Sequence, residues 1–169
     1  MKLSIITISW LLVRLAKADT QPGSLIVHNN CYFAVHVLGV ADMPYLQQDL
    51  KAGETLHLPF RESVSGTGNS LKIATEFDHG NMAQVEYSAC FLGSLCFPEN
   101  SVFYDLSNIN GNPFLPYGIT ISPSRKDCTT VRCPAFNQHC DLVYYQPYDN
   151  QATQGCDVET NLHVELCSG

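Results

Sequence analysis

Eight cysteines limit the folds open to this chain more than any other feature of its sequence. An even number of cysteines in an exported chain predicts a disulfide framework. Zinc is the rival explanation, but cysteine-rich zinc modules use paired Cys-x-x-Cys spacings, which this sequence lacks. The cysteines can pair in many ways, and their spacing leaves the pairing open. The predicted disulfide residues are Cys31, Cys90, Cys96, Cys128, Cys133, Cys140, Cys156 and Cys167.

The beginning of the chain has the pattern of a secretory signal peptide. Lys2 precedes an apolar run from Leu3 to Val13, and Ala16-Lys17-Ala18 supplies the small residues that a signal peptidase recognises. The run is shorter than the roughly 20 apolar residues that span a bilayer. We therefore predict a signal peptide at residues 1–18 and a single mature domain at residues 19–169, secreted to the cell exterior or the cell wall.

Removal of this segment would leave a strongly acidic protein. The segment contains three of the nine basic residues and none of the sixteen acidic ones, so the formal charge would change from −7 to −10. Such a charge repels nucleic acid and anionic membranes, whereas it is compatible with neutral glycans, with cationic partners or with solubility alone. We expect a monomer with neither nucleic acid nor membrane as its partner.

Short segments of alternating apolar and polar residues predict an all-β domain. Leu25 and Val27 alternate with polar neighbours, and so do Val85 and Tyr87. No window longer than about ten residues shows a helical repeat of apolar residues. About eight to ten short strands separated by turns predict a sandwich of two packed sheets. Two strands are expected within residues 24–40, with a bend at Asn29-Asn30, and the others lie near residues 56–58, 70–73, 84–88, 102–106, 117–122 and 161–167.

The chain beyond Pro123 has a different composition. Five of the eight cysteines lie there, together with proline and glycine and few apolar runs. This region cannot bury much core, so we expect its disulfides, each worth roughly 2–4 kcal/mol, to hold it in place. Residues 161–167 alternate again and predict a closing strand.

Several short motifs resemble those of thaumatin-like proteins and follow one another in that family's order. They cover nearly all of the predicted mature chain, and the tail is most similar to the small fungal branch, the antigenic thaumatin-like or yeast-phase-specific proteins. The resemblance implies an all-β, thaumatin-like β-sandwich with a reduced, disulfide-rich C-terminal loop region, and it suggests a bridge from Cys31 to Cys167. The motifs are Leu25 to Cys31, Leu50 to Leu58, Val85 to Ser88, Phe103 to Gly111, Leu115-Pro116, Ile121 to Pro123, Cys133 to Ala135 and Gln146-Pro147.

The resemblance also implies an acidic cleft, which in many family members binds or slowly cleaves β-1,3-glucan. The family's cleft carries one arginine, one glutamate and three aspartates. Glu86 matches the glutamate and Asp105 matches the first aspartate, whereas Asn110 replaces the next aspartate. The arginine is missing, with Thr75 and Glu76 near its place, and most of the second domain that forms the opposite wall is absent from the sequence.

Glu86 and Asp105 are the candidate catalytic residues. Glycoside hydrolysis needs one protonated and one ionised carboxyl group. On neighbouring strands, as the family layout implies, the two groups could reach the required separation of about 5–9.5 Å. The alternative is that Glu86 lies on a solvated strand face while Asp105 bonds to the backbone of the following turn. The missing cleft wall favours this non-catalytic alternative.

Tyrosines near the end of the chain are the candidate ligand-binding residues, together with Asn110. Tyrosine rings stack on sugar rings while their hydroxyl groups form hydrogen bonds. Tyr144, Tyr145 and Tyr148 lie in a segment rich in proline, asparagine and glutamine that cannot bury all three rings. We therefore expect a surface patch there for a glycan or a protein.

We predict no cofactor and no metal. His28 and His36 lie on separate predicted strands where they could meet, but no His-Glu-x-x-His or similar spacing supports a metal site.

Three functions remain open from the sequence. The first is a non-catalytic secreted protein that binds cell-wall polysaccharide, such as β-glucan, in fungal wall remodelling, germination or host contact; this biological setting rests on the resemblance alone. The second is a weak endo-β-1,3-glucanase with Glu86 as the acid and Asp105 as its partner. The third is an effector or inhibitor that acts on a host surface protein.

Overall fold

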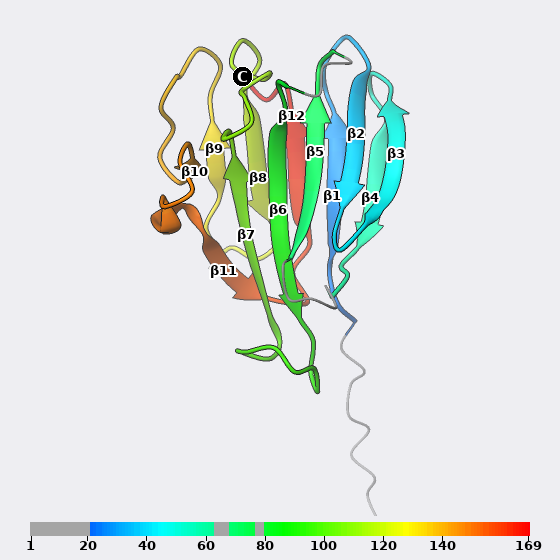
Figure 1. Ribbon diagram of the computed structural model, residues 1–169, viewed down its shortest axis with the longest axis vertical. Coiled ribbons are helices and arrows are strands. Elements are labelled where there is room, and N and C mark those ends of the chain that lie inside the picture. Colours follow the sequence, from blue (N-terminus) through cyan, green and yellow to red (C-terminus); the bar gives the residue numbers. More distant parts are fainter. Residues whose placement is uncertain (1–20, 63–67, 77–79) are drawn as a thin grey trace, which may run out of the picture.

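The computed structural model describes residues 21–62, 68–76 and 80–169. The predicted signal peptide at residues 1–18 lies outside the described residues. The described chain forms two packed sheets with one short 3₁₀ helix at Asn150–Ala152 (Figure 1), so the expected β-sandwich is confirmed. None of its helices has the length and apolar character needed to cross a bilayer.

One sheet has five strands, which in spatial order are β4 (Thr55–Pro59), β1 (Ser24–Asn29), β12 (Leu162–Leu166), β8 (Ile119–Pro123) and β9 (Val131–Cys133). β1 and β12 run parallel, and the other neighbours are antiparallel. The first and last strands are therefore side by side at the centre of this sheet.

The other sheet has seven strands, of which six are in spatial order β10 (Val143–Tyr144), β7 (Ser101–Ser107), β6 (Ala83–Cys90), β5 (Asn69–Ala74), β2 (Val35–Val40) and β3 (Pro44–Leu50). The seventh, β11 (Gln154–Asp157), pairs with β7. From β7 to β3 every neighbouring pair is antiparallel. This run of five strands positions the candidate site.

Apolar side chains from both sheets form one core between them. Leu25 and Val27 of β1 are fully buried, as are Leu71 of β5 and Val85 of β6. Because successive side chains of a strand point to opposite faces, burial of Val85 turns its neighbour Glu86 toward the outer face of the sheet. The core pattern thus determines which residues face outward.

Four disulfides link the chain, as the cysteine count predicts. They are Cys31–Cys167, Cys90–Cys96, Cys128–Cys156 and Cys133–Cys140. The first joins residues 136 positions apart, at the ends of the parallel strands β1 and β12.

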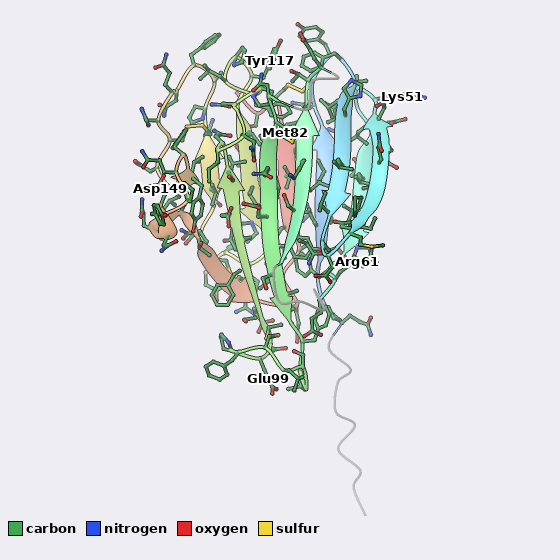
Figure 2. The ribbon with its side chains drawn as sticks, viewed as in Figure 1. Lys51, Arg61, Met82, Glu99, Tyr117 and Asp149 are labelled. Carbon is green, nitrogen blue, oxygen red and sulfur yellow. A yellow bond between two sulfur atoms is a disulfide. The ribbon has the colours of Figure 1, made fainter. Side chains whose placement is uncertain are left out.

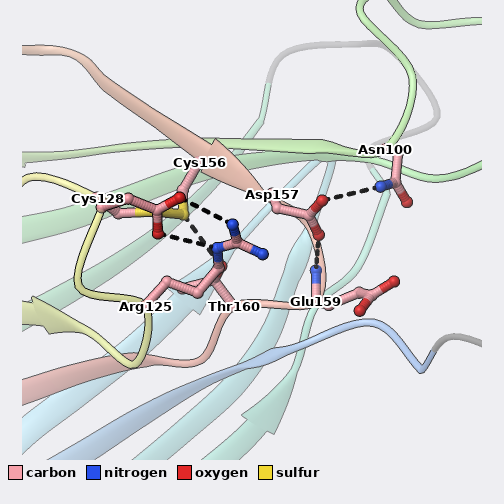
Figure 3. Close-up of polar contacts among 8 residues, drawn as sticks. Asn100, Arg125, Cys128, Cys156, Asp157, Glu159 and Thr160 are labelled. Carbon is pink, nitrogen blue, oxygen red and sulfur yellow. Dashed lines mark hydrogen bonds and ion pairs between the residues drawn. A yellow bond between two sulfur atoms is a disulfide. The ribbon is translucent and has the colours of Figure 1, made fainter.

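The cysteine-rich tail is anchored on the sandwich by polar contacts as well as by disulfides. Asn100 donates to the Asp157 carboxylate at 3.1 Å, and the Glu159 backbone N–H donates to the same carboxylate at 2.9 Å (Figure 3). The Cys128–Cys156 bridge lies beside these contacts and joins the segment after β8 to β11.

Four strands were not expected from the sequence. β3 is an edge strand with polar, exposed residues on both faces, so it lacks the apolar alternation of a half-buried strand. β9, β10 and β11 are only two to four residues long. Their pairing with longer strands at the sheet edges makes them strands, and this long-range pairing leaves no local pattern.

Candidate functional site

The outer face of the seven-stranded sheet carries a group of polar side chains that come from three neighbouring strands. Ser70 of β5 pairs with Glu86 of β6, and Glu86 pairs with Asp105 of β7. One step along the ladder, Lys72 pairs with Gln84. Since directly opposed residues of antiparallel strands lie on the same face, all five side chains belong to one surface.

Glu86 and Asp105, the two candidate catalytic residues, face each other on neighbouring strands. They are opposed residues of β6 and β7, and both are partly buried. Each carboxyl group affects the pKa of the other. Oδ1 of Asp105 is buried and has no hydrogen-bond partner among the described residues. Two carboxyl groups in this arrangement can bond only if one of them is protonated.

The electrostatics of the pair favour this protonated form. Burial, followed by the charge of Glu86, raises the pKa of Asp105 to about 7. Burial also raises the pKa of Glu86, against the opposing effects of a hydrogen bond from Ser70 and the positive charge of Lys72. The two groups interact and titrate as a pair, and their raised pKa values favour a protonated carboxyl group below about pH 7. The pair can therefore both donate and accept hydrogen bonds.

Asn110 joins the same surface through Gln84. Nε2 of Gln84 donates to Oδ1 of Asn110 at 3.1 Å, and Oε1 of Gln84 accepts from the Ser70 hydroxyl at 3.4 Å. Gln84 is buried, so these contacts fix its amide group in one orientation.

A hollow of about 440 Å³ lies over the carboxyl pair, and we call it the Glu86 hollow. Its apolar side is the ring of Phe103, which is 37% exposed and packs over Gly155 of β11, where a side chain would lie within 3.2 Å of the ring. The hollow therefore combines a flat apolar surface with fixed polar groups. Residues that line it include Ser70, Lys72, Glu86, Phe103, Asp105 and Thr153.

The three predicted ligand-binding tyrosines have different surroundings. Tyr144 exchanges a 2.7 Å hydrogen bond with Thr153 at the edge of the Glu86 hollow. The hydroxyl of Tyr145 accepts from the Cys140 backbone N–H at 2.9 Å, so this ring is used to hold the tail. Tyr148 is 86% exposed. Only Tyr144 is linked by a contact to a residue of the hollow.

A second hollow, of about 470 Å³, was missed by the sequence reasoning, and we call it the His36 hollow. Nδ1 of His36 lies 2.6 Å from Oδ1 of Asp49, its opposed residue on β3. The polar run 47–49 is the signal that could have revealed it, but this run belongs to the unexpected edge strand. Residues that line the hollow include His36, Leu38, Gln47, Asp49, Lys72 and Met82.

His28 and His36, which the sequence placed on strands where they could meet, lie on different sheets. His28 is on β1 of the five-stranded sheet, where it bonds to Thr55, whereas His36 is on β2 of the other sheet. The described residues contain no group of three or more histidine, cysteine, aspartate or glutamate side chains that could hold a metal ion.

Comparison with known proteins identifies the family. Residues 12–168 match the family model described as Blastomyces yeast-phase-specific protein. The chain belongs to this family. It is 40% identical over 159 residues to the antigenic thaumatin-like protein of Arthroderma benhamiae, a match that covers 94% of this chain and 77% of that protein. The resemblance to thaumatin-like proteins that the motifs indicated is therefore confirmed.

Two solved structures have the same fold as this family member. The protein elicitor MoHrip2 from Magnaporthe oryzae superposes with a TM-score of 0.70 at 28% identity, over 86% of this chain and 99% of that one. The thaumatin-like xylanase inhibitor TLXI has a TM-score of 0.52 at 16% identity, with the same coverage. The second likeness concerns the fold alone.

This family member also exposes a loop of apolar residues between β6 and β7, which we call the 91–100 loop. It extends beyond one end of the sandwich, where Glu99 lies in Figure 2, at the opposite end from Lys51 and Tyr117. The Cys90–Cys96 disulfide closes its base, and the Gly93 N–H donates to the Glu99 carboxylate at 3.2 Å. Its exposed apolar residues are Leu92, Leu95 and Phe97, at 66, 105 and 92% exposure.

Proposed function

We propose that this chain is an exported, non-catalytic protein that binds cell-wall β-glucan. The Glu86 hollow is the observation that carries the proposal. Its carboxyl pair offers both a donor and an acceptor to sugar hydroxyl groups, and Phe103 offers a flat apolar surface to the C–H face of a sugar ring. A neutral ligand also suits an acidic protein better than an anionic one does.

The pairing of Glu86 with Asp105 favours binding over cleavage. Retaining glycosidases separate their two carboxyl groups by about 5–5.5 Å, and inverting ones by about 6.5–9.5 Å, so that the reacting sugar carbon fits between them. Glu86 and Asp105 are directly opposed on paired strands, where Cβ atoms lie only about 4.5–5.5 Å apart. The glucanase alternative would need these two side chains to separate around the sugar carbon.

Export to the cell wall or beyond agrees with the chemistry of the fold. Four disulfides are typical of proteins that fold in an oxidising compartment. A role in wall remodelling, germination or host contact would follow from glucan binding at that location.

The test uses oxidised protein of residues 19–169 with insoluble β-1,3-glucan, chitin and cellulose. We expect depletion of the protein by β-1,3-glucan without release of reducing ends. Phe103→Ala should weaken the binding by about tenfold, because the stacking surface is lost. Glu165→Gln, on the outer face of the other sheet, is the matched control and should bind like the wild type. Reducing ends that disappear in Glu86→Gln would establish the glucanase instead.

The 91–100 loop favours a second candidate function, binding to another protein. Leu92, Leu95 and Phe97 expose three large apolar side chains within one short loop. The disulfide and the hydrogen bond limit the loop's freedom, which lowers the entropic cost of binding. The neighbouring carboxylate of Glu99 suits a partner whose apolar pocket has a basic rim. MoHrip2 is described as a protein elicitor, and for this chain we propose a host protein as the partner of the loop.

The second candidate is tested with a variant that leaves the hollows untouched. Leu95→Ser should retain glucan binding. It should lose affinity for a host protein that the wild type binds, as measured by titration with that purified protein. A host protein that binds both forms equally would exclude the loop as the contact.

A further inference from the structure

The Glu86 hollow and the His36 hollow lie next to each other on one face of the seven-stranded sheet. Lys72 of β5 lines both of them. From Lys72 the Glu86 hollow extends to β6, β7 and the end of β2 at Val40, and the His36 hollow extends to β3, the first half of β2 and Met82. Lys72 therefore marks the boundary of two hollows that open on the same surface.

The strand register shows that this surface is continuous. Gln47 of β3 is opposed to Leu38 of β2, and Leu38 is opposed to Lys72 of β5. Lys72 is in turn opposed to Gln84 of β6, and beside Gln84 on the same strand face Glu86 is opposed to Asp105 of β7. Because opposed side chains share a face, these residues place all five strands on one surface. Neighbouring strands are about 4.8 Å apart, so the four intervals span roughly 19 Å.

The two hollows on either side of Lys72 both combine polar and apolar groups. Each has a carboxyl group opposed to a second polar side chain, namely Asp105 to Glu86 and Asp49 to His36. Each also has an apolar surface, and in the His36 hollow this surface includes Leu38 and Met82. Repeated polar and apolar groups suit a ligand whose own structure repeats, as the rings of a polysaccharide do.

We propose that the two hollows form one binding groove that holds a run of several sugar rings across the strands, with the His36 hollow as an additional subsite. This inference rests on the proposed function, because it concerns the length and course of the glucan bound there. A chain in this groove passes Lys72 and contacts residues of all five strands from β7 to β3. The groove consequently distinguishes long oligosaccharides from short ones.

The test is the dependence of affinity on the length of the oligosaccharide, measured by calorimetric titration with laminaribiose and laminarihexaose. For the wild type we expect laminarihexaose to bind at least about tenfold more tightly than laminaribiose. His36→Ala should remove most of this difference and leave the affinity for laminaribiose at the Glu86 hollow unchanged. Gln47→Ala, on the exposed edge strand, should reduce the difference without any risk to the core.

His28→Ala is the matched control, because it removes a histidine from the outer face of the other sheet. It should keep the full dependence on length. Equal affinity of the wild type for both oligosaccharides, or an unchanged affinity of His36→Ala and Gln47→Ala for laminarihexaose, would overturn the inference while the proposed function stands. Failure of the wild type to bind any β-1,3-glucan, soluble or insoluble, would overturn both.

Discussion

Two acidic residues that face each other on adjacent strands repel unless they hold a proton, and the fold keeps Glu86 and Asp105 in that position. Alternation around Val85 and Tyr87 predicts from the sequence that Glu86 faces away from the core. Its pairing with Asp105 could not be predicted in this way, because it depends on the register between β6 and β7. The raised pKa values are a consequence of that register and of burial.

Protonation of this pair makes stability depend on pH. The folded state raises the pKa of Asp105 from 3.8 to about 7, so the folded protein holds its proton more tightly than the unfolded chain does. The stabilising effect is complete below pH 4 and is lost as the pH rises through about 7. Between pH 4 and 8 the free energy of unfolding should therefore fall less in Asp105→Asn than in the wild type. The difference should be about 1–2 kcal/mol after allowance for solvent screening.

Urea denaturation of both forms at several pH values measures this effect. If the free energies of unfolding of the wild type and of Asp105→Asn change equally with pH, the raised pKa of Asp105 in the folded state is excluded.

At the scale of elements, the long half-buried strands follow from the sequence and the edge strands do not. β1, β6 and β12 alternate between core and surface, and this pattern is visible along the chain. Most of β3 is exposed to solvent, and polar residues lie on both faces of the strand. Its place in the sheet is set by pairing with β2, and this pairing brings Gln47 and Asp49 to the His36 hollow. That half of the groove was therefore beyond the reach of local patterns.

The 91–100 loop is an element that should be separable from the groove. Replacing Cys90 and Cys96 with serine opens a ring whose cysteines are only six positions apart, so the loss in stability should be about 2 kcal/mol. Binding to insoluble β-1,3-glucan should stay at the wild-type level, because neither cysteine lines a hollow. A clear loss of glucan binding in the folded variant would contradict the assignment of the ligand to the outer sheet face.

At the scale of the whole molecule, one disulfide joins the two ends of the fold. Cys31–Cys167 closes a loop of 136 positions where β1 and β12 lie side by side. Because loop-closure entropy increases with length, replacing both cysteines with serine should cost about 5 kcal/mol, compared with about 2 kcal/mol for Cys90–Cys96. Denaturation of the two double variants compares these values, and equal losses would contradict the entropic account.

The central claim is that a glucan lies across the outer face of the seven-stranded sheet. The most direct measurement is an NMR titration of ¹⁵N-labelled protein of residues 19–169 with laminarihexaose. The account predicts that backbone amide shifts change in β7, β6, β5, β2 and β3, while those of β1, β4 and the 91–100 loop stay in place. Changes confined to the five-stranded sheet or to the loop, or no changes at all, would contradict it.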